Sequence, residues 1–183
     1  MKQLYKKKGL WVLVYFFENP KQEVYLRELA RKLNMSAATV MRITNFLVEE
    51  GLLEKRVEKN ATYFRANLGP NFKEFKKAYT VSKVCGADVI DLIKARSAGL
   101  ASILLYGSAA RGEDDVDSDY DFLVIASKCD VKASELSEKL GREVSLQVYD
   151  AAGWKRASKR NRAFYLDIIS NSIALYGQKP VID

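Results

Sequence analysis

A glycine–serine corner followed by two spaced aspartates gives this 183-residue chain the residue types for phosphate and metal chemistry. Gly107 and Ser108 follow the apolar run 103–106, which is typical of a buried strand. Glycine admits close approach of the backbone, and N–H groups at the start of a helix suit phosphate. Asp119 and Asp121 begin a second apolar run, in which strand alternation would place both carboxylates on one face. Since magnesium prefers such hard oxygen ligands, the pattern predicts a site for a nucleoside triphosphate and a divalent metal.

The residues from Leu104 to Val124 resemble the nucleotidyltransferase superfamily that includes DNA polymerase beta. The matching string reads Leu-Tyr-Gly-Ser-Ala-Ala-Arg-Gly, then Asp-Ser-Asp-Tyr-Asp-Phe-Leu-Val, and is similar to the minimal nucleotidyltransferases of prokaryotes. The general resemblance extends to about Gly177. It implies transfer of a nucleoside monophosphate from a triphosphate to an acceptor, with release of pyrophosphate.

The resemblance also implies a role for each residue of the motif. Asp119 and Asp121 would be the catalytic metal ligands, for magnesium or alternatively manganese. Gly107 and Ser108 would hold the triphosphate. Arg111 would help to neutralise it, or would instead pair with the acidic loop that follows it.

One position departs from the pattern of active family members, which carry a third carboxylate on a later strand. The corresponding stretch here is 142–149, and Ser145 falls where the carboxylate is expected. Glu143 shares its face but lies about 6.6 Å further along a strand, and Asp150 has the opposite parity. Two functions therefore stay open: an active nucleotidyltransferase, and a catalytically impaired, nucleotide-sensing transcriptional regulator.

The first third of the chain has the pattern of a winged helix-turn-helix. Apolar residues recur at helical spacing over 26–33, and Ser36 is a credible N-cap for a helix over 37–50. Gly51 is placed to end that helix, and strands over 53–58 and 62–67 would form the wing. The string from Tyr25 to Val40 resembles the winged-helix domains of prokaryotic transcription regulators.

These elements imply a surface for double-stranded DNA, although winged helices also bind proteins. The net charge favours DNA, because residues 1–68 hold 13 basic and 7 acidic residues whereas 69–183 hold 17 and 16. The predicted DNA-binding residues are four on or beside the recognition helix and four on the wing: Ser36, Thr39, Arg42, Asn45, Lys55, Arg56, Lys59 and Arg65.

The predicted fold class is α+β, with a winged helix-turn-helix followed by a polymerase beta-like α/β domain that has a mixed sheet. The predicted domains are 1–68 for DNA binding, 69–99 as a connecting helical segment that starts at Gly69-Pro70, and 100–183 as the nucleotidyltransferase domain. Strands are expected over 102–106, 119–126 and 143–149, with helices between and after them.

Composition bounds the setting. The apolar run 10–17 is too short to span a bilayer and lacks a signal-peptide cleavage site, so no membrane partner is expected. The absence of histidine excludes histidine-dependent triads, and two cysteines in unrelated contexts favour a reduced, cytoplasmic protein. A protein acceptor or a toxin partner is open by resemblance, as is a homodimer, because winged helices often dimerise.

Overall fold

The computed structural model describes residues 7–182. Contacts divide the chain into two compact units, one ending at Lys76 and one beginning at Lys77. Helix α4, Pro70–Gly86, contributes to both units: Phe72 packs against Phe17 in the first, whereas Val84 belongs to the core of the second. The segment that the sequence predicts as a connection therefore supplies core residues to each unit.

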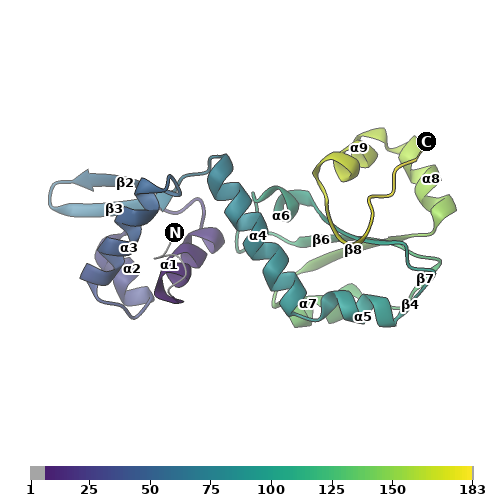
Figure 1. Ribbon diagram of the computed structural model, residues 1–183, viewed down its shortest axis with the longest axis horizontal. Helices are drawn as coiled ribbons and strands as arrows, with labels where there is room; N and C mark the ends of the chain where they lie inside the picture. Colours follow the sequence, from purple (N-terminus) through teal and green to yellow (C-terminus); the bar gives the residue numbers. More distant parts are fainter. Residues whose placement is uncertain (1–6, 183) are drawn as a thin grey trace. The chain divides into compact units, whose positions relative to one another are not determined.

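The first unit is a three-stranded antiparallel sheet with helices, in the order of a winged helix-turn-helix. The strand order is β1-β3-β2, and β2 and β3 form the hairpin that corresponds to the wing (Figure 1). The elements are α1 Lys7–Glu18, β1 Val24–Tyr25, α2 Leu26–Lys32, α3 Ala37–Glu49, β2 Leu53–Glu58 and β3 Ala61–Ala66.

Helix α3 has a defined start and end. Ser36 Oγ accepts a hydrogen bond from the Thr39 backbone N–H at 3.2 Å and so satisfies one free donor of the first turn. At the other end, Gly51 has φ +71°, and the N–H of Leu52 donates to the Leu47 carbonyl. This is the Schellman arrangement, which a glycine adopts without strain. Both ends of the helix follow from residues that the sequence marks.

The second unit is built on a four-stranded mixed sheet in the order β8-β6-β5-β9, where β6 and β8 are parallel and the other pairs antiparallel. Its remaining elements are α5 Val89–Ala95, β4 Ser97–Ala98, β5 Ser102–Tyr106, α6 Gly107–Arg111, β6 Tyr120–Ile125, β7 Lys128–Cys129, α7 Ala133–Leu140, β8 Val144–Tyr149, α8 Ala151–Arg160, α9 Arg162–Asn171 and β9 Ile173–Gly177.

Helices cover both faces of this sheet (Figure 1). Side chains of α5 and α7 join Ile103, Leu105 and Phe122 in a core on one face. On the other face, Trp154 of α8 and the apolar side of α9 pack on residues of opposite parity, including Leu104 and Leu123. Since alternate residues of β5 and β6 are buried on both sides, these strands read as continuous apolar runs. The fold is the predicted α+β class with a mixed sheet.

The helical segment predicted over residues 69–99 ends earlier in the structure. α4 ends at Gly86, α5 ends at Ala95, and Ser97–Ala98 instead form β4, which pairs with β7. Two extended residues carry no periodicity of their own, so only the partner strand makes them a strand. None of the helices in the described part of the chain has the length and apolar character needed to cross a bilayer.

Candidate functional site

The glycine–serine corner follows the last residue of the buried strand β5. Gly107 has φ +71° and starts α6, whose Ala109 and Ala110 are buried in the core. A Cβ at position 107 would overlap a carboxylate oxygen of Asp121. Glycine is required here both by the backbone conformation and by the close approach of Asp121.

The two aspartates lie together beside this corner. Asp121 is the second residue of β6 and is half-buried, while Asp119 directly precedes the strand and is exposed. Burial and the negative charge of Asp119 raise the pKa of Asp121, against the opposing effects of a hydrogen bond from Ser145 and the charge of Arg111. A carboxylate whose ionised form is disfavoured in this way gains from a cation in its vicinity.

Ser145 stands directly opposite Asp121 in the parallel pairing of β6 and β8. Neither of the carboxylates that flank β8 takes this position. Glu143 is exposed and precedes the strand, and Asp150 is the N-cap of α8, where it accepts a hydrogen bond from the Gly153 N–H. No carboxylate on β8 therefore replaces the one expected at position 145.

Tyr106 completes the row of residues across the sheet. It is the last residue of β5 and pairs with Asp121 of β6, which in turn pairs with Ser145 of β8. Burial, followed by the charge of Asp121, raises the pKa of Tyr106 to about 12, against the opposing effects of the Ser145 and Gln147 side chains. At neutral pH the phenol is therefore an uncharged hydrogen-bonding group beside Asp121.

Arg111 is held by carboxylates of the protein itself. Its guanidinium lies 3.0 Å from Glu113 and 3.7 Å from Asp167 of α9. This is the pairing with the acidic loop that the sequence left open. The charge of Arg111 still reaches Asp121, whose pKa it lowers.

The donor set fits a hard divalent cation in part. Asp119 and Asp121 supply two carboxylates, and Ser145 adds a neutral hydroxyl. Within residues 7–182 no group of three or more acidic or sulfur side chains could hold a metal. Magnesium commonly uses one or two carboxylates together with waters and phosphate oxygens, so the pair fits a metal that a bound triphosphate completes.

The first unit presents the predicted DNA-binding residues on two different faces. Ser36, Thr39, Arg42 and Asn45 follow α3 and its N-cap, with Arg42 exposed. Lys55 of the wing joins them, because its ammonium donates to the Asn45 side chain at 3.1 Å. These five residues form one surface, which we call the recognition face.

Two wing arginines point away from the recognition face and are engaged by carboxylates. Arg56 binds Glu23 at 2.6 Å and stacks over Tyr63, and Arg65 binds Glu54 at 2.6 Å. Neighbouring residues of a strand face opposite sides, which separates Arg56 from Lys55. Lys59 lies in the exposed turn of the hairpin with φ +52°.

Sequence reasoning did not assign Tyr106, Gln147 or Tyr149 to the site. Tyr106 reads as the last residue of a buried strand, and the other two read only as the polar side of β8. Alternation from Ser145 could have placed Gln147 and Tyr149 on the same face, but their meeting with Tyr106 depends on the pairing of three strands.

The fold and this site define a two-domain protein in which a winged helix-turn-helix precedes a nucleotidyltransferase fold. The family model of the IclR helix-turn-helix domain matches residues 7–56, and that of the nucleotidyltransferase domain matches residues 88–167. The chain therefore carries an IclR-type helix-turn-helix DNA-binding domain and a nucleotidyltransferase domain, and the resemblance found in the sequence is confirmed.

Several solved structures resemble parts of the chain. A toxin–antitoxin structure with AMP-PNP is 22% identical, with a TM-score of 0.39, over 50% of this chain and 73% of that chain. A mutant of the toxin–antitoxin MntA-HpeT is 20% identical, with a TM-score of 0.40 and the same coverage. Reduced HlyU from Vibrio cholerae is 19% identical, with a TM-score of 0.35, over 40% of this chain and 74% of that one. No curated protein sequence matches the chain.

Proposed function

We propose that the second domain binds a nucleoside triphosphate with a divalent metal and transfers its nucleoside monophosphate to an acceptor hydroxyl. The observation that carries this proposal is the juxtaposition of Asp119 and Asp121 with the Gly107 corner. The burial of Asp121 and its repulsion by Asp119 are costly for a purely structural feature, and a cation would offset them.

In the proposed reaction, Asp119 and Asp121 would hold magnesium or manganese, and Gly107 and Ser108 would contact the triphosphate. The metal supplies charge neutralisation of the phosphates when bound. The acceptor oxygen forms a bond to the α-phosphorus, and the bond from that phosphorus to the oxygen bridging the β-phosphate breaks. Pyrophosphate leaves, and the hydroxyl proton passes to solvent.

Binding of a fluorescent ATP analogue with magnesium, compared among variants, tests the first half of the proposal. Asp121→Asn keeps the size of the side chain, and we expect it to abolish metal-dependent binding. Asp117→Asn is the matched control, because Asp117 is an exposed acid of the preceding loop. Equal affinity in both variants would refute the assignment of the site.

A second function is favoured by one observation, the serine opposite Asp121. In this alternative the domain binds the nucleotide without turning it over and acts as a sensor in transcriptional regulation. Ser145→Asp separates the two, with Ser145→Asn as a neutral control of the same size. A large gain of transfer of label from NTP in the aspartate variant alone favours the sensor, whereas transfer by the unaltered chain that Asp121→Asn abolishes favours the enzyme.

The helix-turn-helix domain would place this chemistry on double-stranded DNA, with the recognition face toward the major groove. A basic excess over residues 1–68 supports this, since it attracts a polyanion. A regulatory or toxin–antitoxin setting and a protein acceptor remain expectations from the family resemblance. Salt-dependent binding of duplex DNA tests the DNA role, and loss of affinity in Arg42→Ala is the expected result.

A further inference from the structure

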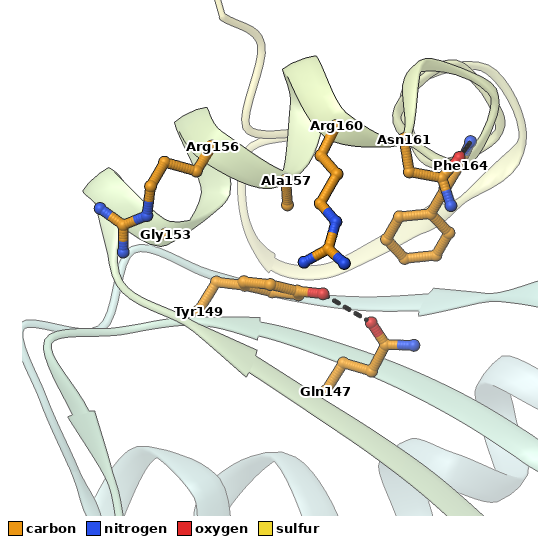
Figure 2. Close-up of a pocket in the computed structure, with 8 residues that line it drawn as sticks. All are labelled: Gln147, Tyr149, Gly153, Arg156, Ala157, Arg160, Asn161 and Phe164. Carbon is orange, nitrogen blue, oxygen red and sulfur yellow. Dashed lines mark hydrogen bonds between the residues drawn. The ribbon is translucent and has the colours of Figure 1, made fainter.

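A cavity of about 790 Å³ lies between β8, α8 and the start of α9. Gln147 and Tyr149 of β8 form its floor, and the Tyr149 hydroxyl donates to the Gln147 side chain at 3.1 Å (Figure 2). Arg160 reaches down from α8 toward this floor, and the ring of Phe164 faces it from α9. Arg156 also lines the cavity and extends toward its Gly153 end, away from Arg160.

Tyr106 connects the lining of the cavity to the acidic pair. Tyr106 of β5 and Ser145 of β8 both pair with Asp121 of β6, and Gln147 in the floor follows Ser145 on the same face of β8. The Tyr106 ring also contacts the Phe164 ring edge-on, with centroids 5.6 Å apart. Alternate residues on a strand are about 6.6 Å apart, so Gln147 lies one such step beyond Ser145. The floor of the cavity therefore begins about 6.6 Å along β8 from the residue opposite Asp121, a separation that a single nucleotide can span.

Three other arginines of the second unit pair with carboxylates, whereas Arg162 lies over the ring of Tyr165. Arg96 pairs with Glu135, Arg111 with Glu113, and Arg142 with Asp114. Arg156 and Arg160 have no carboxylate partner among residues 7–182. A guanidinium without a carboxylate, directed into a concave site, is suited to an anion such as phosphate, which it can bind through two N–H groups.

The remaining lining favours a nucleobase beside that phosphate. Tyr149 and Phe164 present aromatic surface, on which bases stack without strong sequence preference. The Gln147 side chain carries an amide, whose donor and acceptor match the edge of a base. A guanidinium for phosphate, aromatic rings for a base and an amide for the edge of that base together indicate a nucleotide rather than an acidic peptide.

The position of the cavity relative to the corner decides which nucleotide this is. In the sheet order β8-β6-β5, the corner follows β5 and the cavity adjoins β8, so they lie on opposite sides of β6 and its Asp121. In an in-line displacement at phosphorus, the attacking and the leaving oxygens are likewise on opposite sides. With the triphosphate at the corner, the cavity is the side from which an acceptor approaches.

We infer that this cavity is the acceptor site and that the acceptor is a nucleotide, with its phosphate on Arg160 and its base against Tyr149 and Phe164. The nucleotide is either the 3′ end of a nucleic-acid strand or a free nucleotide, which share this chemistry. The inference rests on the proposed function, because it takes the triphosphate at Gly107 and Ser108 as given.

The test measures binding of a fluorescent single-stranded trinucleotide with a free 3′ hydroxyl to the full chain, without NTP or metal. Arg160→Ala should weaken binding roughly ten- to a hundredfold, the range for a charged hydrogen-bonding partner. Lys159→Ala is the matched control, since Lys159 is exposed on the same helix and does not line the cavity; it should change affinity by at most about twofold.

Metal-dependent binding of the ATP analogue, measured in the same variants, separates this inference from the proposed function. We expect Arg160→Ala to retain it and Asp121→Asn to lose it while still binding the trinucleotide. Competition by adenosine monophosphate as strong as by the unlabelled trinucleotide identifies a free nucleotide as the acceptor, and weaker competition identifies a strand end.

Five results would overturn the inference. Equal effects of Arg160→Ala and Lys159→Ala, or competition by an acidic peptide as strong as by the trinucleotide, would remove the nucleotide assignment. Loss of ATP-analogue binding in Arg160→Ala would make the cavity part of the triphosphate site. Absence of trinucleotide binding alongside intact ATP-analogue binding would refute the inference and leave the proposed function standing. If the ATP analogue fails to bind any variant or the unaltered chain, the proposed function fails, and the acceptor role with it.

Discussion

Breaking the ion pair between Arg142 and Asp114 should lower the stability of the second domain far more than breaking an exposed ion pair. The Arg142 guanidinium donates to Asp114 at 2.8 Å and to the Asp115 carbonyl at 2.7 Å, and lies 4.5 Å from the centre of the Tyr120 ring. The two charged side chains are only 8% and 4% exposed. These contacts fix the loop that leads into Asp119.

The expected magnitude follows from burial. Removing one partner of a buried pair leaves the other charge without compensation and costs about 3–5 kcal/mol. For a unit of about 100 residues, each kcal/mol lowers the melting temperature by about 4 °C, so Arg142→Met should lower it by roughly 12–20 °C. The control is Arg96→Met: Arg96 binds Glu135 at 2.8 Å, but the side chains are 47% and 35% exposed. An exposed pair contributes about 1 kcal/mol or less.

The assay follows the second unit alone. The chain has two tryptophans, and Trp154 is buried in the second unit, so a Trp11→Phe background leaves Trp154 as the fluorescence reporter of urea unfolding. The double variant Arg142→Met, Asp114→Leu should recover much of the loss, because no buried charge is then unpaired. Equal and small effects of the Arg142 and Arg96 substitutions, or strict additivity of the two buried ones, would refute the reasoning.

Four further predictions concern single positions. Asp121→Asn should raise the melting temperature at pH 7 without metal, because folding raises the pKa of Asp121 and so disfavours its charged form. The gain in melting temperature should vanish as the pH falls toward 3.8, the ordinary pKa of an aspartate. A variant that is less stable at pH 7 would contradict this. Gly107→Ala should cost at least about 1 kcal/mol in urea unfolding, since its Cβ meets the Asp121 carboxylate at positive φ. Tyr106→Phe should remove a phenol that titrates at about pH 12 in the folded protein, so that the tyrosinate absorbance of the variant and the unaltered chain differs only at the alkaline end. Arg42→Ala should weaken duplex binding and lower the slope of log affinity against log salt by about 1; an unchanged slope would place Arg42 away from phosphate.

The local signals of the sequence predicted most of the elements. Ser36 and Gly51 mark the ends of α3 because a side-chain cap and a left-handed glycine act on their own neighbours in the chain. The same holds for the corner at Gly107 and for the alternation that predicts β5 and β6. These features need no information about distant residues.

The tertiary structure decided what surrounds those elements. Strand pairing set Ser145 opposite Asp121 and joined both to Tyr106. Arg56, on the side of the wing opposite Lys55, is paired with Glu23 at a sequence separation of 33. The cavity needs α8 folded back over β8 to bring Arg160 above Tyr149.

What the sequence by itself determined is therefore the two domains, the order of most of their helices and strands, and the acidic pair beside a glycine corner. Only the tertiary structure decided which groups flank that pair and which charges stay free. The physical reason is that caps, turns and periodicity act within a few residues, whereas register and helix packing are fixed by burial of distant apolar faces against one another.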